Sequence, residues 1–212
     1  MKSKEKSQFV GLDLGKLQDR TAFALVERVQ GMVRGKWTTS YELKGMNRVD
    51  LGIPYTQIAR EVRWLFGNVT PSASSYLVVD MTGVGEAVVE IIRSEIGDEA
   101  VMVPVVFTGG EIFRMEDGVY YVPKRELVLA LMNMMESGTL KIARNLKGAR
   151  HLAGELLTMR SKLSEDTLRT GYEAWREADH DDMVFALALA CWHARRTIYR
   201  LPPVDEKSLR RN

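Results

Sequence analysis

Three short apolar runs open the chain, and a polar or glycine-containing turn separates each run from the next. Runs of this length that are rich in β-branched and aromatic residues are typical of strands. They cover residues 9–14, 21–29 and 36–43. Because antiparallel neighbours can be joined by such turns, the pattern predicts a meander of three antiparallel strands.

From Pro54 onward the spacing of apolar residues changes. Ile58, Val62 and Phe66 recur at helical intervals, and Gly67 is a suitable helix stop. Strands are then predicted over residues 75–80 and 101–107 with a helix between them, followed by helices over 123–138, about 146–162 and from about 181. This order predicts a mixed α/β fold, with antiparallel strands first and crossover connections later.

The length of 212 residues is that of one domain. We expect this domain over residues 8–200, with flexible tails at 1–7 and 201–212. The composition, with 45% hydrophobic and 27% charged residues, is that of a globular protein. A net charge of +2, from 30 Lys+Arg and 28 Asp+Glu, excludes a histone-like basic protein but not a local basic patch.

Cysteine and tryptophan add little chemistry. Cys191 is the single cysteine, which excludes an internal disulfide and a cysteine zinc cluster, and we expect it to be a small buried apolar residue. The tryptophans Trp37, Trp64, Trp175 and Trp192 are assigned to the core. No apolar run approaches the length of a membrane span, and the N-terminal segment lacks the apolar stretch of a signal peptide. We therefore expect a cytoplasmic location.

Carboxylates stand at unusual places in this pattern. Asp13 interrupts the first apolar run, Asp80 ends a later one, and Asp181 and Asp182 stand where the very apolar last helix begins. Burying an unpaired carboxylate is unfavourable, and a cation offsets that penalty. Several acids that converge on one point would form a site for a hard metal ion with oxygen ligands.

Simpler explanations exist for each acid taken alone. A single Asp after a strand is usually a turn residue or a helix N-cap, and this interpretation is favoured for Asp80 by itself. One negative charge at the N-terminus of the helix is enough to interact favourably with the helix dipole. That explanation therefore accounts for one of Asp181 and Asp182 but not for both. His180 is more typical of a solvated turn residue than of a ligand.

Three stretches together resemble the nuclease domain of phage large terminase subunits, an RNase H-like endonuclease that cuts concatemeric DNA during packaging. They are GLDLGKLQDRTA at residues 11–22, VVDMTGVG at 78–85 and HDDMVFALALA at 180–190. Residues 107–110 and 122–127 also resemble this family. The stretches occur in the family's order, and the similarity runs from about residue 8 to about residue 195.

The resemblance implies an RNase H-like fold, in which three antiparallel strands are followed by parallel strands and helices flank the sheet. It also implies that Asp13, Asp80 and one or both of Asp181 and Asp182 bind Mg²⁺ or Mn²⁺, with two ions at the site. Two such ions can support hydrolysis of a phosphodiester bond. The implied partners are double-stranded DNA, a separate terminase ATPase, the small terminase subunit and the portal, in the host cytoplasm.

Further residues are weaker candidates. Asp19 is either an auxiliary ligand or a turn-forming residue, and His180 is a second auxiliary candidate. Thr82 is expected to shape the turn after Asp80. Lys16 lies beside the first acid and is a candidate DNA contact. A cluster of cations could neutralise phosphates, although a solvated helix face explains any one of them: Lys141, Arg144, Lys147, Arg150, Arg160 and Lys162.

Other classes of protein fit less well. The sequence GLDLG at residues 11–15 resembles the phosphate loop of actin-like and sugar-kinase-like nucleotide-binding proteins, but the chain is short for two lobes. Residues 83–87 lack the third glycine of a dinucleotide-binding loop. A catalytically silent DNA-binding packaging module and a junction-resolving nuclease remain alternatives. Both candidate motor loops are one residue short of GxxxxGK, so no packaging motor is expected in this chain.

Overall fold

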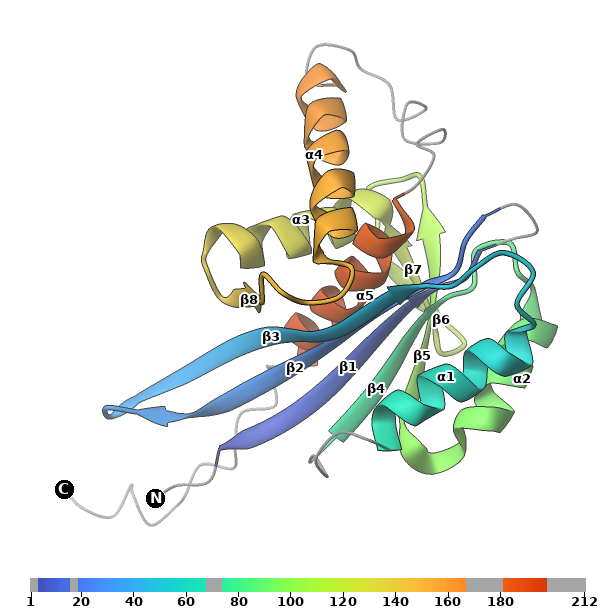
Figure 1. Cartoon of the computed structure of the whole chain (residues 1–212), viewed down its shortest axis with the longest axis horizontal. Helices are drawn as coiled ribbons and strands as arrows, with labels where there is room; N and C mark the ends of the chain where they lie inside the picture. The colour runs from blue at the N-terminus through green and yellow to red at the C-terminus, as the bar shows by residue number, and fades with distance from the viewer. Residues whose placement is uncertain (1–3, 16–18, 68–73, 167–180, 198–212) are drawn as a thin grey trace.

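A central mixed β-sheet organises the part of the chain that the computed structural model describes, residues 4–15, 19–67, 74–166 and 181–197. The sheet has eight strands in the order β6-β7-β5-β4-β1-β2-β3-β8 (Figure 1). The elements are β1 (Glu5–Asp13), β2 (Ala22–Val33), β3 (Lys36–Arg48), α1 (Tyr55–Gly67), β4 (Ser74–Asp80), α2 (Glu86–Ile96), the 3₁₀ turn η1 (Gly97–Glu99), β5 (Val101–Thr108), β6 (Arg114–Glu116), β7 (Val119–Pro123), α3 (Lys124–Glu136), β8 (Leu140–Ile142), α4 (Ala149–Asp166) and α5 (Asp182–Arg196).

The strand directions confirm the predicted fold class. β1, β2 and β3 form the antiparallel meander, and β4, β5 and β7 continue from β1 as parallel strands. At the two edges β8 lies parallel to β3 and β6 lies antiparallel to β7. The sequence pattern missed β6, β7 and β8, because strands of three to five residues hold too few positions to show a period of two.

The first strand corrects one boundary. β1 begins at Glu5, so residues 5–7, which we assigned to a flexible tail, belong to the sheet. Their polar side chains have partners: Lys6 forms an ion pair with Glu27 at 3.1 Å, and Ser7 Oγ accepts a hydrogen bond from Arg28 Nη2 at 3.2 Å. Residues 201–212, the other expected tail, lie outside the described residues.

The pleat of the central strands divides the core between two layers of helices. Alternate residues of β1 face opposite sides, so Phe9 packs with α3 and α5 whereas Val10 and Leu12 pack with α1 and α2. Figure 1 shows α1 and α2 together on one side of the sheet and α3 and α5 on the other. The strand ends that carry Asp13 and Asp80 therefore lie between two covered faces.

The tryptophans do not behave as expected. Trp192 is buried on α5, and Cys191 beside it is buried as predicted. Trp37 and Trp64, however, are 49% and 65% exposed, so their assignment to the core was wrong. Trp175 lies outside the described residues.

α5 is buried on all sides. Every residue from Met183 to Ala194 is buried, which is typical of a helix enclosed in a core and explains its nearly uninterrupted apolar sequence. Its last turn has a partner for a carbonyl that the helix itself leaves unpaired, because Arg28 Nη1 donates a hydrogen bond to Ala194 O at 2.9 Å. A cationic partner also suits the negative end of the helix dipole.

Gly11 is the point where α5 meets the sheet most closely. A Cβ added to Gly11 would lie 1.9 Å from Ala186 O and 2.8 Å from Ala190 N, both of which are backbone atoms of α5. Only glycine allows this approach. The contact brings the start of α5 toward the end of β1, two residues beyond Gly11.

We predict that Gly11→Ala lowers the free energy of unfolding by about 3 kcal/mol or prevents folding, because neither backbone can move aside. Gly45→Ala is the matched control. A Cβ at Gly45, also within a strand of the meander, meets nothing within 4 Å, so we expect a change within about 0.5 kcal/mol. Urea denaturation of the three proteins measures the difference, and similar midpoints for the two variants would contradict it.

Candidate active site

Strand register places Asp13 and Asp80 side by side. β1 and β4 are parallel neighbours in which Leu12 pairs with Val79, so each acid follows directly after a paired residue. Val78, two residues before Asp80, packs in the core layer under α5, as Phe9 does in β1. Because side chains alternate along a strand, both carboxylates point to the α5 side of the sheet.

The two carboxyl groups are electrostatically coupled. Asp80 is 6% exposed, and burial raises its pKa. Asp13 is partly exposed as a residue, but burial of its carboxyl group, followed by repulsion from Asp80, raises its pKa well above the usual range. A hydrogen bond between the two side chains lowers the pKa of Asp80. The pair therefore tends to hold a proton between its carboxylates.

Thr82 fixes the orientation of Asp80. Its backbone N–H donates to Asp80 Oδ1 at 2.8 Å, and its hydroxyl donates to the same oxygen. The hydroxyl also accepts a hydrogen bond from Phe107 N at 2.8 Å, which ties the end of β4 to β5. Thr82 thus shapes the turn after Asp80, as the sequence predicted.

Lys124 is a residue of the site that sequence reasoning did not single out. It is the first residue of α3, and its positive charge lowers the pKa of both Asp13 and Asp80. Its Nζ lies 5.7 Å and 4.9 Å from the ring centroids of Phe107 and Phe185. The only signal in the sequence was its place within residues 122–127, one of the stretches that resemble the terminase nuclease.

The start of α5 brings further acids to the pair. Asp182 is the first residue of the helix and Asp181 is its N-cap position, where its carbonyl accepts a hydrogen bond from Phe185 N at 3.0 Å. Both charges raise the pKa of Asp13, and Asp182 has the larger effect. The acids of all three sequence motifs therefore converge on one region.

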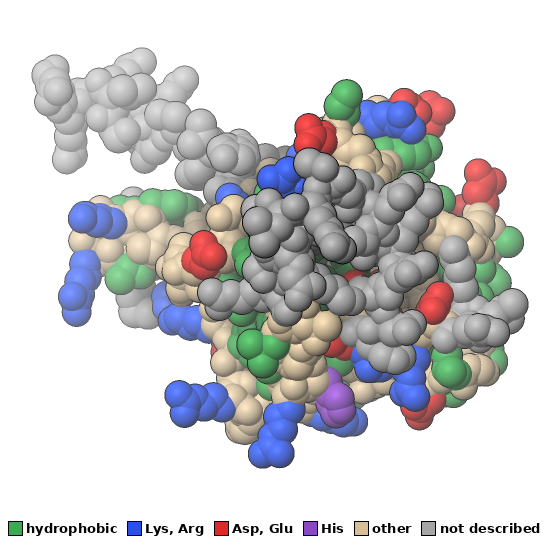
Figure 2. Space-filling view, turned by 90° about the horizontal axis from the view of Figure 1, so that it is seen from above, with side chains coloured by type: hydrophobic (Ala, Val, Ile, Leu, Met, Phe, Trp, Pro, Cys, Tyr) green, Lys and Arg blue, Asp and Glu red, His purple; other side chains and the backbone are tan. Residues whose placement is uncertain are grey.

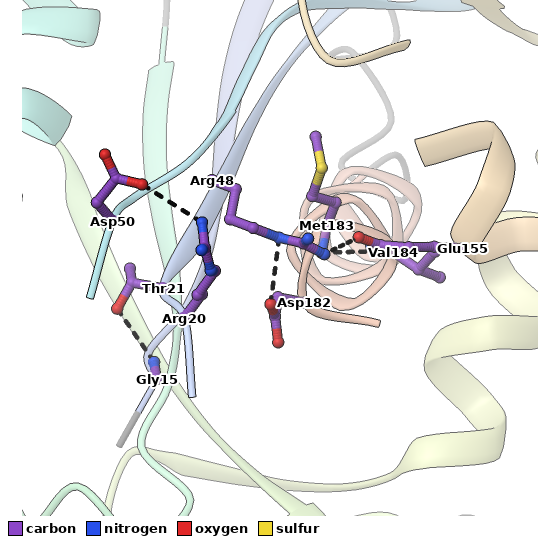
Figure 3. A network of polar contacts seen from close by, with 9 residues as sticks. All are labelled: Gly15, Arg20, Thr21, Arg48, Asp50, Glu155, Asp182, Met183 and Val184. Atoms are coloured by element: carbon purple, nitrogen blue, oxygen red, sulfur yellow. Dashed lines mark hydrogen bonds and ion pairs between the residues drawn. The ribbon is translucent and has the colours of Figure 1, made fainter. Parts of the chain in front are cut away.

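A partly buried ionic network holds this end of α5 (Figure 3). Glu155 of α4 accepts hydrogen bonds on Oε2 from Met183 N and Val184 N, each at 3.1 Å, and so caps the helix from a distant part of the chain. Arg48 pairs with the other oxygen of Glu155, and its Nε lies 3.3 Å from Asp182 Oδ2. Arg48 therefore links the acid that caps α5 to the acid that begins it.

Register explains how Arg48 reaches this position. Asp13 pairs with Ala22 of β2, and Ala22 pairs with Arg48 of β3, so Arg48 lies level with Asp13 across the sheet. Burial raises the pKa of Glu155 to about 7, although Arg48 and the N–H of Val184 oppose this shift. Arg48 is thus the positive charge that helps keep the cap ionised near neutral pH.

A family model described as the terminase RNase H-like domain matches residues 10–194. The chain belongs to this family. Among solved structures it is similar to the human cytomegalovirus terminase nuclease domain, with 16% sequence identity and a TM-score of 0.46 over 93% of this chain and 85% of that chain. A search of curated proteins gives no match.

The other candidate residues of this terminase RNase H-like domain are less central. Asp19 is exposed and lines a cavity of about 190 Å³ with Gly15 and Asp50. Lys16 and His180 lie outside the described residues. Lys141, Arg144, Lys147 and Arg150 are all exposed, as a solvated face would be, and are spread over β8, the following loop and the start of α4. The side chains of Arg160 and Lys162 are not described.

The donor atoms suit a divalent metal ion. Within the described ranges, no group of three or more His, Cys, Asp or Glu side chains is already arranged to hold a metal. The chemistry of the donor set nevertheless fits, because Asp13 and Asp80 offer hard carboxylate oxygens whose repulsion a cation would relieve. Asp182 and Asp181 add negative charge from the start of α5.

None of the helices in the described residues is both long enough and apolar enough to cross a bilayer.

We predict that Arg48→Gln lowers the free energy of unfolding by roughly 3 kcal/mol, because it leaves the buried Glu155 without its counter-charge. Arg20→Gln is the matched control, since Arg20 pairs with the exposed Asp50 at the same 3.3 Å that separates Arg48 from Asp182. That change is expected to remain below about 1 kcal/mol. Guanidinium denaturation at pH 7 measures the free energy of unfolding of both variants. An equal decrease in the two would contradict the structural role of Arg48.

Proposed function

We propose that this domain is a metal-dependent DNA endonuclease that hydrolyses phosphodiester bonds in double-stranded DNA. The observation that carries the proposal is the adjacent pair Asp13–Asp80 at the ends of β1 and β4, next to the acids at the start of α5. Such a concentration of negative charge is unfavourable in a folded protein unless a cation compensates it. Membership of the terminase RNase H-like family supports the same chemistry.

Mg²⁺ or Mn²⁺ would be held by Asp13, Asp80 and Asp182, with Asp181 as the alternative donor from α5. Such ions, when bound, would supply activation of a water nucleophile and stabilisation of the leaving oxygen. Burial favours the protonated form of Asp13 and Asp80, so these carboxyl groups would lose a proton to solvent when they bind the metal. Lys124, whose charge already favours ionisation of both acids, is well placed to attract the phosphate of the substrate.

The start of α5 is assigned a positioning role. Glu155 caps the helix, and Arg48 holds Oδ2 of Asp182, so the helical acid keeps one orientation relative to the strand acids. Outer partners of this kind orient carboxylate ligands in metal sites. A separate terminase ATPase, the small terminase subunit and the portal are proposed partners, and the host cytoplasm is the proposed location.

The direct test incubates supercoiled plasmid with the protein and Mg²⁺ or Mn²⁺. Asp13→Asn and Asp80→Asn should each lower the cutting rate by more than about 100-fold, beyond what loss of an outer partner causes. Asp182→Asn should lower the cutting rate more than Asp181→Asn does, because the charge of Asp182 has the larger effect on the pKa of Asp13. Asp117→Asn, at an exposed turn that asparagine tolerates, is the matched control.

Cutting that needs no metal, or that survives at both Asp13→Asn and Asp80→Asn, would refute the proposal. ATP binding without any DNA cutting would instead favour the nucleotide-binding alternative. Metal-independent DNA binding alone would favour a silent packaging module.

Metal binding should also depend on pH. Because the folded protein raises the pKa of Asp13 and of Asp80, protons compete with a cation for these carboxylates at higher pH than they do for ordinary aspartates. Mn²⁺ affinity should therefore rise with pH, and Mn²⁺ binding should release protons. Calorimetry in two buffers of different ionisation enthalpy measures the release, and identical heats in both buffers would contradict it.

A further inference from the structure

The hairpin of β2 and β3 continues beyond the rest of the sheet. β1 pairs with β2 only as far as Glu5 opposite Gln30, whereas β2 and β3 remain paired to Val33 opposite Lys36. Residues 32–38, here named the arm, are all exposed. Figure 1 shows this hairpin projecting at the left, away from the helices. Among the described residues, no third strand pairs with the arm on its β1 side.

The arm has a defined shape. Arg34 and Gly35 both have positive φ, 49° and 78°, which is the backbone of the tight type I′ turn that suits twisted hairpins. Met32 lies opposite Trp37, and Val33 lies opposite Lys36. The hairpin therefore presents fixed cross-strand pairs instead of a loose loop.

Its apolar side chains face solvent. Met32, Val33 and Trp37 are 41%, 45% and 49% exposed. Met32 and Trp37 lie opposite each other and form an apolar pair on one face of the ribbon, whereas Val33 points to the other face. Trp37 lies beyond the point where β1 stops pairing with β2, which explains why its expected burial fails.

The charge of the arm has one sign. Arg34 and Lys36 are exposed, and the sequence from residue 28 to residue 41 contains no Asp or Glu. The acids that flank this stretch are paired with lysines: Glu27 with Lys6 and Glu42 with Lys44. Figure 2 shows basic and apolar side chains at the end of the projection on the left. Charge complementarity therefore points to a polyanion as the occupant.

We propose that the arm binds duplex DNA outside the cleavage site; the proposal rests on the endonuclease function proposed above. A two-stranded ribbon fits the major groove of B-DNA, which is about 12 Å wide. Arg34 and Lys36 contact phosphates, while Trp37 and Met32 supply apolar contact with sugars and base edges. A partner protein with an acidic surface is the competing occupant.

The arm is too far from the acids to act in hydrolysis. Ala22 pairs with Asp13, and Val33 follows Ala22 by eleven positions along β2, which at about 3.3 Å per position is roughly 36 Å. This distance is about one turn of B-DNA. The arm therefore contributes to affinity for long duplexes and not to the chemical step.

The test compares full-length wild type with Arg34→Asn/Lys36→Thr, in which Asn-Gly preserves the type I′ turn and threonine suits the strand. Binding of a labelled duplex of about 30 base pairs is followed by fluorescence anisotropy without divalent metal, from 50 to 200 mM KCl. Loss of two phosphate contacts should make the slope of log K against log salt shallower by about 1.8. Wild type then loses about 12-fold more affinity than the variant over this range.

Arg60→Ser/Arg93→Ser removes the same charge from exposed positions on α1 and α2 and should keep the wild-type slope. Met32→Thr/Trp37→Thr should weaken binding several-fold without changing the slope. A wild-type slope and affinity in both arm variants would overturn the proposal and favour a protein partner. Failure of wild type to cut plasmid would count instead against the proposed endonuclease, so the two failures are distinguishable.

Discussion

The approach of α5 to β1 over Gly11 is the constraint on which the rest of the structure depends. Without a side chain at Gly11, the backbone of α5 lies against the strand at Ala186 and Ala190. The helix is consequently enclosed on all sides, and its first turn lies near the end of β1. The acids of two distant segments come together because one residue leaves room for a helix.

A helix buried in this way needs partners for its unpaired end groups. Charged side chains from outside the helix supply them at both ends, with signs that match the dipole: Glu155 at the start and Arg28 at the end. Arg48 then joins Glu155 to Asp182. The same contacts that make the buried helix tolerable also orient an acid of the proposed site.

The net charge of the molecule is close to zero, but its acidic and basic side chains gather in different places. Acids gather at the ends of β1, β4 and at the start of α5, whereas the arm of β2 and β3 carries only cations. The proposed cation-binding region and the proposed anion-binding arm can coexist in a chain of net charge +2. The whole-chain charge could not reveal this separation, because it sums contributions that lie at opposite ends of the strands.

The sequence by itself determined the order of the main strands and helices, the place of Asp13 and Asp80 at strand ends, and the acidic entry to α5, since local periodicity encodes them. It could not place Lys124 beside the acids or link Arg48 to Glu155, which is 107 positions away in the chain. It also assigned Trp37 to the core, because residue type shows apolar character but not whether a neighbouring strand continues. Only the tertiary structure decided these features, through strand register and the packing of segments that are remote in sequence.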